Sequence, residues 1–560
     1  MKHKAIKRRH SKTAPLSKGA YYIKKPKVET VNEINASLGS HPNIQRVLSP
    51  VKGHMTLDIY PLHFIVRTDD PFMKNVIKEF TRKWLRFQIF KNPRTGEYER
   101  TYVGTYAAAT KSRSEVRYHL NQLQGFLQHC TFMNVPKELI IQNVHTHTKV
   151  ADTVPMKLIE GWSPRGEQPD VIAYALKDDY PIKTLTIQTG QGKSATSLFI
   201  NHHKQERFCL ITRPQYLEKW VIDLKKMYQI EDDEILIVQG SKTLTKLIHA
   251  AKAGKHTQYK AILISNRTYI SYIREYETHE SLIEETFGCI PDDFMPLLGI
   301  DTLYVDEGHQ DSRIMFKIYL YSKVAKIVVM SATFDPDDPF LKKVTEVMYP
   351  KAYRYQPKLS NQHTEAYVVR YHFRDPSRIR CQARGNYSHM EFEKSIMRQK
   401  HIERNYYNMI ASLLEGQYLN SKKPGFKAIV FCYTVAMCTK LRDYLQDRFD
   451  NQVKVGRYCQ QDDYSVLLES DIVITTLMSA GTGVDIPGLY VGIMTVALRS
   501  TQANIQTIGR LRKMADGTTP KFLWLSNSDN PKHKQYDHEK FVMFRPITKS
   551  VGEFIYSEQI

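Results

Sequence analysis

The sequence TGQGKS at Thr189–Ser194 lies between a short apolar stretch, Leu185–Gln188, and the helix-like stretch Ala195–Asn201. This strand, loop and helix order decides the fold class, because glycines let successive backbone N–H groups converge on phosphate oxygens at a helix N-terminus. The residues expected to face phosphate are Thr189, Gly190, Gln191, Gly192 and Lys193, with Ser194 as a Mg²⁺ ligand. The strict pattern has a glycine where this chain has Ile187, so the loop alone fits a structural turn equally well.

A second motif, DEGH at Asp306–His309, directly follows the apolar stretch Leu303–Val305. A carboxylate at the carboxyl end of a strand can hold Mg²⁺, and its neighbour can orient or deprotonate an attacking water. We therefore expect Asp306 to ligate the metal and Glu307 to act on the water. For His309, a neutral donor that senses the nucleotide and a helix-capping residue are equally good interpretations.

Three more motifs follow in order: SAT at Ser331–Thr333, GTGVD at Gly481–Asp485 and QTIGRLR at Gln506–Arg512. A phosphate loop, an acidic pair and a distant arginine cluster predict hydrolysis of a nucleoside triphosphate between two lobes. An arginine of the last motif would stabilise negative charge that develops in the transition state. Arg510 is the first candidate for this role and Arg512 the second.

With these motifs, residues 160–530 resemble the superfamily 2 helicases, whose motors consist of two RecA-like lobes. The resemblance implies ATP and Mg²⁺ as cofactors, and an α/β fold of two tandem RecA-like P-loop lobes. It also implies roles for particular residues: Arg165 and Gln168 in adenine binding, Pro214 and Trp220 in contacting DNA, Gly483 and Asp485 facing the nucleotide, and Gln506 and Arg510 in the catalytic cleft. The family spaces its second arginine three residues after the first, where this chain has Lys513.

Positive charge is concentrated at the N-terminal end of the chain. The net charge is +22, and residues 1–150 contain 26 Lys and Arg against 10 Asp and Glu. Such a concentration is typical of a protein that binds a polyanion. Residues 1–27 hold ten basic residues and no acidic one, so they are predicted to be a flexible tail that contacts phosphate; a merely solubilising tail is the alternative.

The rest of the N-terminal segment is predicted to be a small basic α+β domain. Residues 55–67 alternate like one strand, and residues 84–90 and 98–106 are expected to form a hairpin with its tip at 92–96. Residues 112–130 are predicted to be a helix, because Ser112 and Glu115 have the spacing of a capping box. Arg113 and Arg117 are expected on its surface.

The predicted layout has five parts: a basic tail at 1–27, an α+β nucleic-acid-binding domain at 28–150, a first RecA-like lobe with the ATP site at 160–350, a second lobe at 351–545 and a C-terminal tail at 546–560. Residues 389–414 are expected to form one long helix in the connection between the lobes. A basic domain before such a motor resembles the layout of UvsW-type phage recombination DNA helicases.

The seven scattered cysteines argue against a disulfide framework and against zinc. No apolar stretch approaches a membrane span. The expected location is therefore the cytoplasm, which is the host bacterial cytoplasm if the chain is phage-encoded.

The predicted function is an ATP-dependent DNA helicase or translocase that remodels junctions, forks or displacement loops in recombination, repair or replication. Duplex, branched and single-stranded DNA are the expected partners, with single-strand-binding or recombination proteins as candidate protein partners. Three alternatives stay open: an RNA helicase, the motor subunit of a restriction-type translocase, and a nucleic-acid-binding protein with an inactive motor.

Overall fold

The computed structural model describes residues 53–91, 98–110, 115–187, 191–336, 338–356, 363–383, 385–450, 452–459, 462–463, 465–480 and 486–560. The chain divides into two compact units, Met1–Lys52 and Gly53–Ile560, and every described residue belongs to the second. The predicted tail, the hairpin tip, Thr189, Gly190 and the GTGVD motif lie outside the described residues. Among the helices that are described, none is long and apolar enough to cross a membrane.

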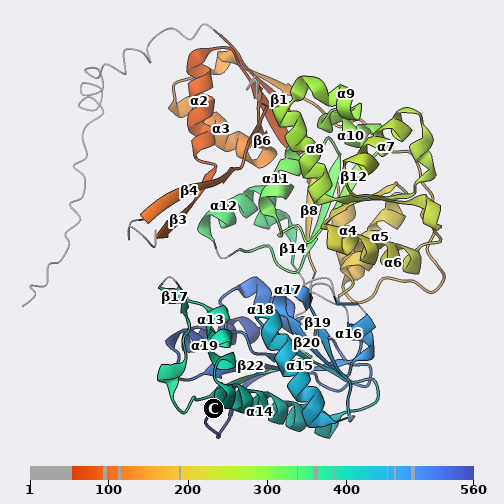
Figure 1. The fold of residues 1–560 in the computed structure, drawn as a ribbon. Helices are drawn as coiled ribbons and strands as arrows, with labels where there is room; N and C mark the ends of the chain where they lie inside the picture. Colours follow the sequence, from red (N-terminus) through yellow and green to blue (C-terminus); the bar gives the residue numbers. More distant parts are fainter. Residues whose placement is uncertain are drawn as a thin grey trace, which may run out of the picture. The chain divides into compact units, whose positions relative to one another are not determined.

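An α+β domain comes first, as the sequence predicts (Figure 1). Its sheet has the strand order β5-β6-β2-β1-β7, and β3 and β4 form a separate antiparallel pair. The elements are β1 Met55–Ile59, β2 His63–Arg67, α2 Pro71–Arg82, β3 Leu85–Lys91, β4 Tyr98–Thr105, β5 Ala108–Ala109, β6 Glu115–His119, α3 Leu123–Phe132 and β7 Ile140–Val144. The predicted hairpin at 84–106 is thus confirmed, with its arms in β3 and β4.

Two predictions for this domain are wrong. Residues 55–67 form two antiparallel strands that turn around Pro61, because proline cannot donate to a ladder. Ser112 and Arg113 of the predicted helix at 112–130 lie outside the described residues. Glu115 starts β6, which pairs with β2, and the α-helix begins at Leu123. The backbone N–H groups of residues 115–119 find partners in a neighbouring strand, so tertiary pairing overrides the local capping pattern.

The first lobe contains a parallel sheet with the order β10-β11-β9-β12-β13-β8-β14. Its strands are β8 Ile182–Thr186, β9 Phe208–Thr212, β10 Ile235–Val238, β11 Ala261–Ser265, β12 Thr302–Asp306, β13 Lys326–Ser331 and β14 Arg354–Tyr355. Its helices are α4 Gln168–Leu176, α5 Lys193–Lys204, α6 Leu217–Met227, α7 Ser241–Lys252, α8 Asn266–Thr278, α9 Ile283–Phe287, α10 Pro291–Leu297, α11 Ser312–Leu320 and α12 Pro339–Met348.

The second lobe contains another parallel sheet, with the order β19-β20-β18-β21-β22-β15-β23. Its strands are β15 Glu365–Tyr371, β18 Lys427–Cys432, β19 Val455–Tyr458, β20 Ile472–Thr476, β21 Leu489–Met494, β22 Lys521–Asn527 and β23 Ser550–Ile555. Its helices are α13 His389–Met397, α14 Lys400–Gln417, α15 Val435–Phe449, α16 Ser465–Glu469, α17 Leu477–Ala480, α18 Thr501–Ile508 and α19 Pro531–Phe544; β16 Gln382–Ala383 and β17 Asn386–Tyr387 form a small ribbon.

Numbered from its own first strand, each of the two large sheets has the same order, 3-4-2-5-6-1-7. The two lobes are therefore two copies of one topology, and the predicted α/β class with two RecA-like lobes is confirmed. Each lobe ends with an edge strand beside its first strand, β14 beside β8 and β23 beside β15. This repeat places β14 in the first lobe beyond residue 350, and it puts β23 of the second sheet within residues 546–560, where a tail was predicted.

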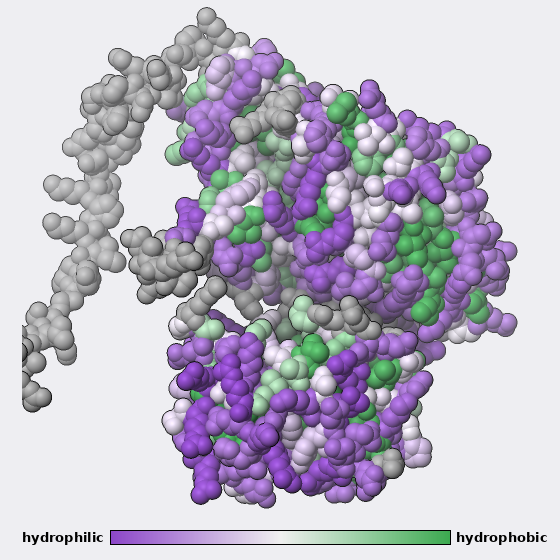
Figure 2. Space-filling view, viewed as in Figure 1, coloured by the Kyte–Doolittle hydropathy of each residue, from purple (hydrophilic) through white to green (hydrophobic). Residues whose placement is uncertain are grey.

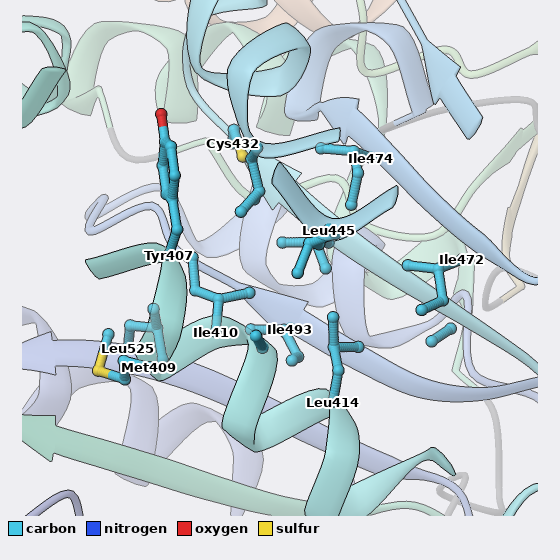
Figure 3. Packing of buried hydrophobic residues seen from close by; sticks show 14 of the residues in the cluster. Tyr407, Met409, Ile410, Leu414, Cys432, Leu445, Ile472, Ile474, Ile493 and Leu525 are labelled. Carbon is cyan, nitrogen blue, oxygen red and sulfur yellow. The ribbon is translucent and has the colours of Figure 1, made fainter. Parts of the chain in front are cut away.

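Apolar packing holds α14 and α15 on the second sheet. Tyr407, Ile410 and Leu414 of α14 lie among the buried side chains of neighbouring strands and of α15 (Figure 3). The predicted long helix at 389–414 is in fact α13 and α14, separated at Arg398 and Gln399, where the backbone of Gln399 turns extended.

Hydrophilic residues cover much of the drawn face, with one hydrophobic area on the right of the view (Figure 2).

Glu393 of α13 is a buried carboxyl group that binds the segment directly before α15. It accepts hydrogen bonds from the backbone N–H groups of Tyr433 and Thr434 and from the Thr434 hydroxyl, at 2.7–2.8 Å. Burial raises the pKa of Glu393 to about 7, against the opposing effect of these donors. The nearby His389, 3.7 Å away, has a pKa held far below its usual range by its own burial, so it supplies no compensating charge.

Arg117 joins the N-terminal domain to the first lobe. Its guanidinium donates to Asp292 of α10 at 2.7 Å and to Glu115 at 2.6 and 2.8 Å, and it lies 4.2 Å from the centre of the Tyr321 ring. The side chains of Arg117 and Asp292 are 3% and 4% exposed. The expectation that Arg117 lies on the surface is therefore wrong: it is a buried charge with two carboxylate partners.

Candidate functional site: the nucleotide cleft

The phosphate loop precedes α5 as the sequence predicts. Gly192 has a φ of 77°, a left-handed conformation that favours glycine, and it is followed by Lys193 as the first residue of α5. The Gln168 amide donates to the backbone oxygens of Gln191 and Gly192 at 3.4 Å and accepts from the Arg165 N–H at 2.9 Å. Gln168 therefore ties the segment expected to bind adenine to the loop expected to bind phosphate, while Arg165 is exposed.

Lys193 and Glu307 form an ion pair within the first lobe, although 114 positions of the sequence separate them. Burial alone would lower the pKa of Lys193, but the nearby carboxylates of Glu307 and Asp306 outweigh burial and raise it. Glu307 has a φ of 51°, in a region that non-glycine residues adopt rarely. The candidate water-activating carboxylate is thus engaged by the candidate phosphate-binding lysine.

Gly308, the next residue of the DEGH loop, leaves no room for a larger residue. A Cβ atom added there would lie 2.2 Å from a methyl carbon of Val329 on β13. The DEGH loop consequently lies directly against the strand that carries the SAT motif.

His309 connects the DEGH loop to the SAT motif and to the last motif. The Ser331 hydroxyl donates to the backbone oxygen of Thr333, so it accepts from Nδ1–H of His309. Burial lowers the pKa of His309 to about 3, which keeps the ring neutral, and its Nε2 is then the acceptor for the Gln506 amide at 3.4 Å. Of the two interpretations that the sequence left open, the geometry favours the neutral donor.

The last motif contributes Gln506 from α18 and Arg510 just after it. Arg510 is 6% exposed, and its positive charge opposes the rise in the pKa of Lys193. Arg512 and Lys513 are exposed. Burial and the electrostatic influence on Lys193 therefore both favour Arg510 over Arg512 as the arginine of the cleft.

Trp220 does not lie where the resemblance to a DNA-contacting motif puts it. The side chain is fully buried, packs beside Phe208, and donates from its indole N–H to Oδ2 of Asp306 at 3.0 Å. The sequence did contain a signal for this burial, because Leu217, Trp220 and Leu224 have the spacing of one helix face. Pro214 of the same motif is half-buried.

Asp311, five residues after Asp306, is a residue that the sequence did not single out. Its carboxylate accepts from Arg213 at 2.9 Å and from Asn266 at 3.4 Å, and it lies 3.6 Å from Arg267. Asp311 therefore ties the segment around Pro214 and the start of α8 to the DEGH loop.

The oxygen donors of the cleft fit Mg²⁺. Asp306 ends β12 and Ser194 is the second residue of α5, and Mg²⁺ prefers such hard oxygen ligands. Within the described part of the chain, no three or more His, Cys, Asp or Glu side chains gather into a group that could hold a metal ion. Mg²⁺ commonly takes only one or two protein ligands and completes its shell with phosphate oxygens and water.

Comparisons with known proteins give fold-level likenesses only. No protein-family model and no curated protein matches the chain. Among solved structures, S. cerevisiae Dbp5 bound to RNA and ADP BeF3 shares 12% identity over 70% of this chain and 91% of that one, with a TM-score of 0.45. The Pyrococcus furiosus Hef helicase domain shares 11% over 67% and 98%, with a TM-score of 0.42. T4 UvsW shares 12% over 90% and 99%, with a TM-score of 0.32.

At these identities and TM-scores, the likenesses identify neither the substrate nor the activity of this chain. Its own geometry is more specific: two lobes of one topology carry the phosphate loop, DEGH and SAT on the first sheet and the QTIGRLR motif on the second. These two α/β lobes of one topology are the fold class that the motifs predict.

Proposed function

We propose that the protein is an ATP-dependent DNA helicase or translocase that remodels branched DNA. The observation that carries the proposal is the set of contacts around the DEGH loop. Glu307 pairs with Lys193 of the phosphate loop. His309 contacts Ser331 in the same lobe and Gln506 in the other lobe. One loop thus contacts the lysine proposed to bind phosphate, the SAT motif and the second lobe.

This arrangement suits a nucleotide-driven change between the lobes. When the phosphates of ATP engage Lys193, the Glu307 carboxylate loses its partner and can orient an attacking water. Mg²⁺ held by Asp306 and Ser194 would neutralise charge on the phosphate oxygens. Arg510 supplies positive charge that counts most in the transition state, and the His309–Gln506 contact gives the second lobe a connection to the same loop.

Branched DNA as the substrate rests on the charge distribution of the chain. Residues 1–52 hold 12 Lys and Arg against two Glu. In the described part of the N-terminal domain, several basic side chains are already paired with carboxylates, Arg67 with Asp58 and Glu115 and Arg86 with Asp338 among them. We therefore assign most of the phosphate-binding charge to residues 1–52, and we propose that the folded domain orients the branch.

The test is ATP turnover by the purified chain with single-stranded, duplex, forked and four-way DNA and with RNA of matched length. Lys193→Ala and Glu307→Gln should each lower turnover by about 10²-fold or more, while Glu307→Gln still binds ATP. Near-normal turnover in either variant would refute the assignment of the cleft. Stronger stimulation by RNA than by any DNA would establish the RNA helicase alternative, and an inert wild-type chain would establish the inactive motor.

A further inference from the structure

Trp220 is a fully buried tryptophan whose only polar group is directed at the acidic pair. Its indole N–H lies 3.0 Å from Oδ2 of Asp306, and its ring belongs to the core cluster of the first lobe. Buried tryptophans commonly find a hydrogen-bond acceptor, so the bond by itself does not imply a function. Its acceptor, however, is the carboxylate at the end of β12 that the proposed function assigns to Mg²⁺.

The ring cannot easily move its N–H away from that carboxylate. Trp220 lies in α6 between the buried Leu217 and Leu224 on the same helix face, and its ring is 5.9 Å from the ring of Phe208 on β9. A donor that packing holds in place fixes the rotation of the carboxylate it bonds. With Oδ2 engaged by the indole, Oδ1 is the oxygen left to face a metal ion.

We propose that Trp220 is a positioning residue for Mg²⁺ binding: it orients Asp306 so that Oδ1 ligates the ion that accompanies the nucleotide. The proposal rests on the proposed function, since it takes Asp306 to be the metal ligand. Partners that hydrogen-bond to a ligating carboxylate fix its orientation, and their loss commonly lowers metal affinity or activity by about 10- to 100-fold.

The chain offers a matched control in the second lobe. Trp524 is also fully buried, and its indole N–H donates to Oδ1 of Asp537 at 3.0 Å. Asp537 is additionally bonded by Ser526 and Arg370, in a lobe whose sheet carries no phosphate loop among its described residues. Trp220→Phe and Trp524→Phe therefore remove the same kind of hydrogen bond, and only the first bond involves the cleft.

The experiment measures ADP affinity of the full chain, with a fluorescent ADP, as Mg²⁺ is titrated. The expected result for Trp220→Phe is a rise of about 10-fold or more in the Mg²⁺ concentration that gives half of the affinity gain, with unchanged affinity in EDTA. Trp524→Phe should behave like the wild type. In an Asp306→Asn background, Trp220→Phe should have no further effect on the Mg²⁺ dependence, because both changes act through one carboxylate.

A normal Mg²⁺ dependence in folded Trp220→Phe would overturn the proposal. If that variant does not fold, fluorine NMR of the wild-type chain labelled with 5-fluorotryptophan takes its place. The chain has four tryptophans, so Phe variants at 84, 162 and 524 assign the Trp220 resonance by elimination. That resonance should shift when Mg²⁺ joins ADP, and should stay still in Asp306→Asn; an unresponsive Trp220 resonance would equally overturn the proposal. A wild-type chain that binds no Mg²⁺ with ADP would instead refute the proposed function.

Discussion

The buried pair between Arg117 and Asp292 should anchor the N-terminal domain on the first lobe, and Arg117→Met tests this. Methionine keeps much of the apolar volume but removes the guanidinium, so Asp292, at 4% exposure, is left as an uncompensated buried charge. Breaking one side of such a pair costs about 3–5 kcal/mol. Glu115 loses Arg117 as a partner as well, but it keeps its 2.8 Å hydrogen bond from Arg67. The free energy of unfolding should therefore fall by an amount within that range, with no comparable further loss from Glu115.

The paired replacement Arg117→Met with Asp292→Leu should cost much less than the sum of the single changes. Neither charge then remains buried without its partner, and apolar replacement of buried ion pairs is often close to neutral. The matched control is Arg82→Met, which breaks the exposed pair with Glu79 and should change stability by no more than about 0.5 kcal/mol.

Urea unfolding gives the free energies, and hydrogen exchange at β6 and α10 locates the destabilised region. Exchange should accelerate on both sides of the junction in Arg117→Met and return towards the wild-type rate in the paired replacement. Wild-type unfolding midpoints in both single variants, or fully additive changes, would refute the view that this pair fixes the domain to the lobe.

Three further predictions concern pH, the arginines and the basic segment. The pKa of Glu393 is raised to about 7 in the folded chain, so between pH 4.5 and 7 the folded chain binds a proton that the unfolded chain has lost. The free energy of unfolding should therefore fall by up to about 3 kcal/mol as pH rises from roughly 4.5 to 7. Glu393→Gln should remove this decline, as measured by urea unfolding at pH 5 and 8. Arg510→Ala should lower ATP turnover much more than ATP affinity, whereas the exposed Arg512→Ala should leave turnover nearly unchanged, and the reverse order in steady-state kinetics would exchange their roles. Deleting residues 1–52, which hold 12 Lys and Arg against two Glu, should weaken DNA binding and flatten its salt dependence. The slope should fall by about 0.9 log units per log unit of salt for each duplex phosphate that the segment neutralises, and an unchanged slope would assign this charge to another partner.

The motifs predicted the two lobes well because each motif can be placed next to a strand or helix from the residues directly around it. Lys193 follows β8 and Asp306 ends β12. Parallel strands bring their carboxyl ends to one edge of the sheet, so the sequence alone predicts that these two residues lie close together. The residues of the predicted site that fall outside the described segments, Gly483 and Asp485 among them, stay predictions.

Side-chain depth and tertiary pairing could not be predicted in the same way. Arginine is usually a surface residue, and Arg117 can be buried because α10 supplies the carboxylate of Asp292 to pair with its charge. Glu115 fits a capping box three residues after a serine, yet the edge of β2 offers its backbone a ladder. Trp220 belongs to a motif that suggested contact with DNA, but the acceptor that decides its role lies 86 residues further along the chain.

The position of β15 has a consequence for how the chain folds as it is synthesised. This first strand of the second lobe lies between β22 and β23, whose residues follow it by about 150 positions or more. At about 5–20 residues per second, the apolar face of β15 waits roughly 10 to 30 s for a neighbouring strand on either side. The first strand of the first lobe, β8, is in the same position, because it lies between β13 and β14, which are also made much later. Each lobe of the nascent chain should therefore hold its first strand without a neighbour until its last two strands are made, so that the two lobes in turn present an unpaired apolar strand to chaperones.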